Sequence, residues 1–123
     1  MELYIDIRWL LERQADILPK QPVIDDFSSL VAAVARHRVN TPRVGAVVDD
    51  AWRAAALAHT IIRLRPLPAR NALFAAALTV AYMDAAGEAV DAPYGALIDL
   101  AHDIDTGRTD TYAAAERIRS WRI

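Results

Sequence analysis

Cysteine is absent from this sequence of 123 residues, and lysine occurs only once, at Lys20. The first absence excludes disulfide bonds, thiolate metal sites and thiol catalysis. The second leaves a lysine-based mechanism almost no basis, because the other thirteen basic residues are all arginine. Any phosphate site must therefore use arginine side chains, which bind anions through planar, forked donors.

Long apolar runs are also missing. The uncharged stretch at residues 71–83 is too short to span a bilayer, which requires about 20 apolar residues. The amino terminus shows no export signal, because the sequence from Met1 to Leu18 is interrupted by the charged residues Asp6, Arg8, Glu12 and Arg13. We therefore expect a cytoplasmic protein without a membrane partner.

Aromatic residues are scarce at 7%, whereas alanine is abundant, and this balance favours helices over a β-sandwich. The 54% hydrophobic and 24% charged content is typical of a globular protein. The length suffices for one domain, residues 1–123, with a core of its own. The net charge of −2 argues against a general nucleic-acid binder, so DNA is not an expected partner.

The pattern predicts an all-α fold, a compact bundle of about six helices around a buried central helix. The expected helices cover residues 6–18, 25 or 26 to 38, 51–62, 68–83, 93–105, and 109 or 110 to 121. Aspartates stand at four of the starts as N-caps, and Pro68 and Pro93 are expected at the first helical positions of the other two. Residues 71–83 show no polar face, which predicts a central helix buried on all sides.

Apolar residues of the outer helices recur at helical spacing and are expected to face inward. These positions are Ile7, Leu10, Leu11, Ala15 and Leu18 in the first helix, Phe27, Leu30, Val31, Val34 and Ala35 in the second, Leu97, Ile98, Leu100, Ala101 and Ile104 in the fifth, and Tyr112, Ala115 and Ile118 in the last. The alanines of the third helix permit close approach of a neighbour.

A basic loop with two prolines leads into the central helix. Arg63 and Arg65 precede this helix, and Arg70 and Asn71 fall in its first turn. A cation there is unfavourable by roughly 0.3–1 kcal/mol unless an anion is present, and the helix start offers unpaired N–H groups. These groups predict a site for phosphate or for a partner's carboxylate. The alternative is that the arginines are solvated or pair with Asp49, Asp50 or Asp84.

Two other groups of residues suggest weaker hypotheses. Asp99, His102 and Asp103 lie at a helical spacing that suits a metal or a proton relay, although a solvated helix face explains the same pattern. Residues 117–122 combine arginines with a tryptophan, which suits contact with RNA or a partner, or simply a capped last helix.

The helical order and the loop before an apolar helix that ends near Gly87 form a familiar combination. After Gly87 come three further segments of the same combination, Ala96-Leu97-Ile98-Asp99, Thr106-Gly107-Arg108 and Ala113-Ala114-Ala115-Glu116-Arg117-Ile118-Arg119. From Tyr4 to Trp121 the chain thereby resembles Doc, the short toxin branch of the Fic family. The resemblance implies a toxin component that transfers a phosphoryl group or AMP from a nucleotide to a protein hydroxyl. It further implies an antitoxin protein as partner and a protein target such as elongation factor Tu.

The family carries a motif of the form HxFx(D/E)xNKR on this loop and helix start. In the family the His assists proton transfer, the acid holds Mg²⁺, and the Asn, Lys and Arg surround the nucleotide phosphates. When the chain is aligned without gaps on Gly87, Asn71 takes the Asn position, and Leu67 takes that of Phe and is implied to pack the motif loop.

The other motif positions depart from the pattern. Arg65 stands in place of the His, Ala69 in place of the acid, and Ala72 and Leu73 in place of the basic pair. General acid–base chemistry requires a group that titrates near neutral pH, which arginine does not. No catalytic residue and no metal ligand is therefore assigned, and His59 is better explained as a packed helix histidine than as a replacement base.

The resemblance leaves three hypotheses open. The first is an active Doc-like toxin. The second is a pseudoenzyme that binds an antitoxin peptide, or ATP or another nucleotide, through Arg63, Arg65, Arg70 and Asn71 without turnover, and without a bound Mg²⁺ because the acid is missing. The third is a helical interaction module with no relation to the family.

Overall fold

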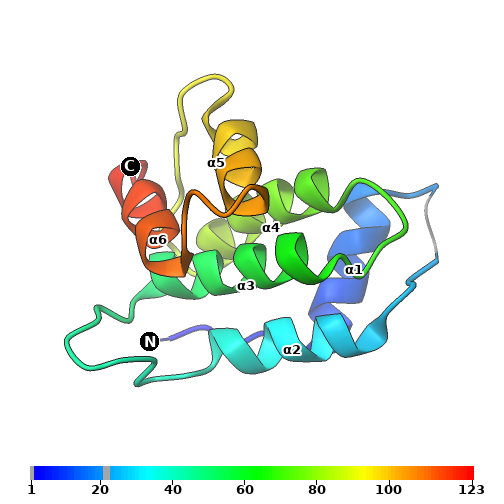
Figure 1. Cartoon of the computed structure of the whole chain (residues 1–123), viewed down its shortest axis with the longest axis horizontal. Coiled ribbons are helices and arrows are strands. Elements are labelled where there is room, and N and C mark those ends of the chain that lie inside the picture. The colour runs from blue at the N-terminus through cyan, green and yellow to red at the C-terminus, as the bar shows by residue number, and fades with distance from the viewer. Residues whose placement is uncertain (1, 21–22) are drawn as a thin grey trace.

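The computed structural model describes residues 2–20 and 23–123, which form an all-α bundle as the sequence predicts (Figure 1). The helices are α1 (Ile7–Ile17), α2 (Phe27–His37), α3 (Asp50–Leu64), α4 (Asn71–Ala85), α5 (Ala96–Asp105) and α6 (Thr111–Ser120). Within these residues the only β-type pairing is an isolated bridge between Val90 and Arg122. None of the helices in this part of the chain is long and apolar enough to cross a membrane.

Aspartate side chains cap four of the helices, as expected. The carboxylates of these N-cap residues accept hydrogen bonds from backbone N–H groups in the first turns of α1, α2, α3 and α6, and the caps are Asp6, Asp26, Asp49 and Asp110. Each such cap contributes about 1 kcal/mol. The four helix starts are therefore fixed by local chemistry that is visible in the sequence.

The predicted starts of α4 and α5 at Pro68 and Pro93 are wrong by three residues. The N-cap residues are instead Arg70 and Gly95, and neither supplies a side-chain hydrogen bond. Both adopt a left-handed backbone, with φ of 65° and 81° respectively. Because a right-handed helix cannot contain such a residue, neither helix extends back to its proline.

Helix α3 is the centre of the bundle, with α2 on one side and α4, α5 and α6 on the other (Figure 1). Every residue from Ala51 to Ile62 except His59 is buried. Alanines at five of these positions let the neighbouring helices approach closely, and the large side chains of Trp52, Leu57 and Ile61 fill the space between them. The predicted use of these alanines is thus seen directly in the packing.

The prediction that residues 71–83 are buried on all sides is wrong. One face of α4 packs inward through Phe74, Leu78, Tyr82 and Met83, but Leu73 and Val80 are 37% and 38% exposed on the other. Helix α4 therefore lacks a polar face without being buried on all sides, because its second apolar face is exposed to solvent. The most buried helix is α3, even though its sequence includes arginines and a histidine.

The predicted inward faces of α1, α2 and α5 are only partly correct. Ala15, Phe27, Val31, Ala35 and Ile98 are exposed. Helix α2 instead packs on α3 through Ser29, Leu30, Ala33 and His37. Small residues on this face allow a closer approach of the helix backbones than Phe27 and Val31 would permit, and this close packing decides the rotation of α2.

A buried polar cluster fastens the amino-terminal segment to the core. Arg53 of α3 is fully buried, and its guanidinium donates to the carbonyls of His37 and Val39 at 2.6 and 3.3 Å. It also donates to Glu2 Oε1 and Asn40 Oδ1, each at 2.8 Å. A single arginine thereby joins the amino terminus, the end of α2 and the loop that follows.

His37 completes this cluster. Its Nε2 accepts a hydrogen bond from the Ile5 amide at 3.0 Å, and its Nδ1 contacts the Val34 carbonyl. This arrangement requires a proton on Nδ1 and none on Nε2. Burial, with a smaller contribution from the charges of Arg38 and Arg53, lowers the pKa of His37 to about 4, so the ring is neutral at pH 7.

Candidate anion-binding loop

The loop between α3 and α4 is the site that the sequence singles out, and Pro66 and Leu67 attach it to the rest of the chain. The carbonyl of Pro66 accepts hydrogen bonds from the amides of Asp25 and Asp26, at 2.9 and 3.2 Å, which ties the loop to the start of α2. Leu67, the position implied to pack the loop, is 2% exposed. The loop is therefore anchored in the core although it carries arginines at its surface.

Asn71 holds the loop from within. Its Oδ1 accepts from the Leu67 amide at 3.0 Å, and its Nδ2 donates to the Leu67 carbonyl at 2.9 Å. This pair of hydrogen bonds closes a turn around residues 67–71 and uses the side-chain amide on the loop itself. In this structure Asn71 thus positions the loop, and a ligand would contact it only through its remaining hydrogen-bonding capacity.

Arg63 and Arg65 both contact the end of α5. Arg63 donates to the carbonyls of Ile104 and Asp105 at 3.4 and 3.1 Å. A cation is favourable there, because it interacts with the negative end of the helix dipole. Arg65 pairs with the Asp105 carboxylate at 2.8 Å. Neither arginine pairs with Asp49, Asp50 or Asp84, the acids suggested as alternatives, and Asp49 instead pairs with Arg119 at 2.7 Å.

Arg70 differs from the other arginines of this region. Its side chain is exposed and makes no hydrogen bond or ion pair with any residue that the structure describes. Its backbone φ of 65° is a left-handed conformation that costs a residue with a side chain roughly 1–2 kcal/mol. A free guanidinium thus stands at a strained N-cap position, beside a helix start that no side chain caps.

These residues surround a concavity of about 350 Å³ over the start of α4. Its lining consists of Arg65, Asp105, Ile62 and residues 67–72. Of the four predicted anion-binding residues, the structure brings Arg65, Arg70 and Asn71 to this concavity, whereas Arg63 lies outside its lining. The charged groups are two guanidinium groups and one carboxylate, so the concavity keeps one positive charge beside the positive end of α4.

The lining offers no group suited to proton transfer near neutral pH. It includes no histidine, and its single carboxylate is held by Arg65. His59 does not line it; burial, followed by the charges of Arg36 and Arg63, lowers the pKa of that half-buried ring. The arrangement can bind an anion, but it supplies no base for the attack of a hydroxyl.

The acidic group on α5 forms no metal site either. Asp103 pairs with Arg117 at 2.7 Å, while Asp99 and His102 are exposed. Across residues 2–20 and 23–123, no three His, Asp or Glu side chains come together in a way that would hold a metal ion.

Asp105 is a site residue that the sequence analysis missed. It lies 40 residues after Arg65 in the chain, and its place in the concavity depends on the way α5 packs against α3. No local pattern marks that contact.

Comparison with known proteins finds no family model and no curated protein that matches this chain. The likeness to Doc therefore remains a prediction from the sequence.

Proposed function

We propose that this chain is a Doc-like member of a toxin–antitoxin module that binds a phosphate-bearing ligand over the start of α4 and does not perform the group transfer of the family. One observation carries the proposal: the concavity holds two arginines and an uncapped helix start, but neither a histidine nor an acid free to bind a metal. Anion binding needs only the first set of groups, whereas the family reaction also needs the second.

The charges of the site predict modest affinity. Asp105 already neutralises Arg65, which leaves Arg70 and the partial charge of the α4 start to attract the ligand. One charge-assisted contact and one helix terminus together correspond to a dissociation constant on the order of 1 mM. A nucleotide would gain further affinity only from contacts with the apolar part of the lining, Ile62 and Leu67 among them.

Calorimetric titration with ATP, ADP and AMP, with and without Mg²⁺, tests ligand binding. We expect binding that Arg70→Ala abolishes and that Mg²⁺ does not strengthen. Arg122→Ala is the matched control, because Arg122 pairs with Glu88 just beyond the opposite end of α4. Equal binding by the wild type and Arg70→Ala would exclude this site.

A second variant tests the electrostatic assignment in the opposite direction. Asp105→Asn removes the only carboxylate from the lining and releases Arg65 towards the ligand. We expect nucleotide binding to strengthen by about threefold to tenfold in this variant. Weaker binding would show that Asp105 supports the ligand instead of competing with it.

Catalysis is tested separately with labelled ATP and cell lysate. We expect no labelled protein and no toxicity on expression, since the lining lacks a group for proton transfer. A labelled band, for example at the mass of elongation factor Tu, would contradict the proposal of an inactive protein. It would support the hypothesis of an active Doc-like toxin. An adjacent gene for a small antitoxin-like protein would support the Doc relation and a cytoplasmic site of action.

A further inference from the structure

A second hollow lies between α4 and α5. This α4–α5 groove has a volume of about 380 Å³ and shares no lining residue with the anion-binding concavity. Its walls are Leu73, Ala76, Ala77 and Val80 of α4, the loop at residues 92–95, and Leu97 and Ile98 of α5. The lining includes no charged residue, so the groove is almost entirely apolar.

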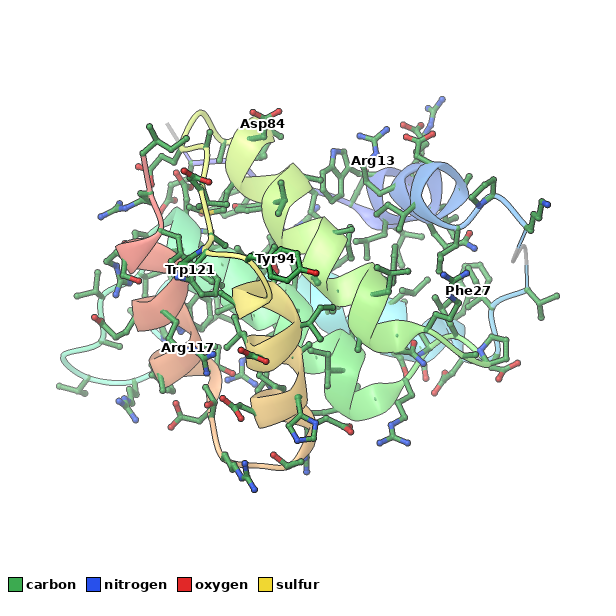
Figure 2. The ribbon with its side chains drawn as sticks, turned by 90° about the horizontal axis from the view of Figure 1, so that it is seen from above. Arg13, Phe27, Asp84, Tyr94, Arg117 and Trp121 are labelled. Atoms are coloured by element: carbon green, nitrogen blue, oxygen red, sulfur yellow. The ribbon has the colours of Figure 1, made fainter. Side chains whose placement is uncertain are left out.

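The groove is hollow because small side chains form its floor and larger ones form a wall beside it. Ala76 and Ala77 form a low floor on α4, while Tyr94 and Ile98 rise on the other wall with exposures of 107% and 54%. Figure 2 shows Tyr94 on the outer face of the bundle, over α4 and α5. A side chain as exposed as Tyr94 gains nothing from the fold, which leaves its apolar ring available to a partner.

The groove has the length of a short helix. Leu73, Ala77 and Val80 recur along one line of α4 and therefore form a continuous stripe. At a rise of 1.5 Å per residue this stripe extends for roughly 11 Å, the length of two turns of a partner helix. Helices that dock in such grooves present anchors at i, i+3 or i+4, and i+7.

Three acidic residues lie next to the groove in the chain. Asp84 follows the stripe by one turn of α4, and Asp91 and Asp99 adjoin the lining residues Ala92 and Ile98. All three carboxylates are exposed, and none is in an ion pair within the described part of the chain. The acids in ion pairs there are Glu2, Glu12, Asp16, Asp49, Glu88, Asp103, Asp105 and Glu116. The unpaired carboxylates at the groove are thus available to a cationic partner.

We propose that the α4–α5 groove binds an amphipathic α-helix of a partner protein, with its apolar side chains in the groove and its lysines or arginines against Asp84, Asp91 and Asp99. The rim charge decides between occupants. A second copy of this chain would bring like carboxylates together, and an anionic membrane or nucleic acid would also be repelled. The proposal goes beyond the anion site and stands or falls independently of it.

Synthetic peptides of 16 residues test this directly. One peptide carries leucines at i, i+3, i+4 and i+7 with flanking lysines, a second replaces each lysine with glutamate, and a third scrambles the first. By fluorescence anisotropy we expect the lysine peptide to bind at least about tenfold more tightly than either of the others, and to weaken with salt. Equal binding of the lysine and glutamate peptides would overturn the role of the rim.

Two variants locate the binding. Ala77→Arg fills the floor and repels a basic helix, so it should abolish binding of the lysine peptide. Val31→Arg is its matched control, because Val31 is an exposed apolar residue on α2 at 55% exposure. The triple variant Asp84→Asn, Asp91→Asn and Asp99→Asn keeps the apolar lining and should weaken lysine-peptide binding about tenfold, even if Ala77→Arg were to unfold.

The competing occupants have their own measurements. Sedimentation of the full chain at micromolar concentration should show a monomer, and vesicles of phosphatidylcholine and phosphatidylglycerol should not bind it. A dimer that Ala77→Arg disrupts would assign the groove to a second copy and overturn the proposal. Vesicle binding that Ala77→Arg abolishes would overturn it in favour of a membrane.

Discussion

At the scale of single residues, two polar side chains in the core connect distant parts of the chain. Arg53 donates to the carbonyl of His37 and to the carboxylate of Glu2, and His37 accepts from the amide of Ile5. Buried charges and rings of this kind are tolerated only when their donors and acceptors are matched. The exception is Arg53 Nε, which has no hydrogen-bond partner in the described part of the structure.

Arg53→Met should strongly destabilise the protein. The substitution removes four hydrogen bonds, and it leaves the buried carbonyl of His37 without this donor. We expect the free energy of unfolding to fall by about 3 kcal/mol, measured by urea denaturation. Glu2→Gln serves as the comparison and should cost much less, because the guanidinium keeps its other acceptors. If Arg53→Met left the free energy of unfolding unchanged, the cluster would contribute no stability.

Stability should also fall as the pH falls below about 6.5, because of His37. In the unfolded chain this ring takes up a proton near its ordinary pKa of 6.5, whereas in the folded protein it does so only near pH 4. Between these values the unfolded state binds more protons, so acid favours unfolding, with a slope of at most about 1.4 kcal/mol per pH unit. In urea titrations from pH 7 to 4, His37→Gln should lower stability at pH 7 and flatten this slope. An unchanged slope would assign the pH dependence to other groups.

At the scale of elements, the loop between α3 and α4 has left-handed residues at both of its ends, Arg65 and Arg70. Glycine takes this conformation without strain, as Gly87 and Gly95 do elsewhere in the chain. Two arginines at such positions sacrifice stability, which is a common feature of binding sites. The positive φ at both arginines is the kind of backbone strain expected at such a site.

Arg70→Gly should stabilise the fold and weaken anion binding together. The substitution relieves the left-handed strain, and we expect a gain of about 1 kcal/mol in the free energy of unfolding. Arg70→Ala is the control, because it removes the same guanidinium but leaves the strain of the left-handed backbone in place. The two variants should therefore lose nucleotide binding equally and differ in thermal midpoint. Equal stability of the two would show that the loop relaxes by another route.

Asn71→Asp tests how this loop is held. The carboxylate still accepts from the Leu67 amide, but it loses the donor to the Leu67 carbonyl. We expect a cost of about 1 kcal/mol in Asn71→Asp and about 2 kcal/mol in Asn71→Ala, measured by thermal unfolding. A negligible cost in both variants would contradict the positioning role of Asn71.

At the scale of the whole molecule, the order of stability should follow the distance from α3. This helix packs extensively against α2, α4, α5 and α6, whereas the main contacts of α1 are fewer and are made with α2 and α4. We expect amides of α3 to exchange with solvent only through global unfolding, and those of α1 through local opening at lower free energy. Native-state hydrogen exchange measures both. Protection in α1 equal to that in α3 would contradict this order.

The sequence by itself determined the all-α class, the approximate number of helices and four of the helix starts to within one residue, because capping aspartates and helical periodicity act over three or four neighbouring residues. It also drew attention to the loop that leads into α4. The tertiary structure decided which helix lies at the centre, which face of α2 packs inward and where Arg65 finds its partner. Asp105 and the open apolar face of α4 depend on contacts between segments far apart in the chain, and no local pattern encodes such contacts.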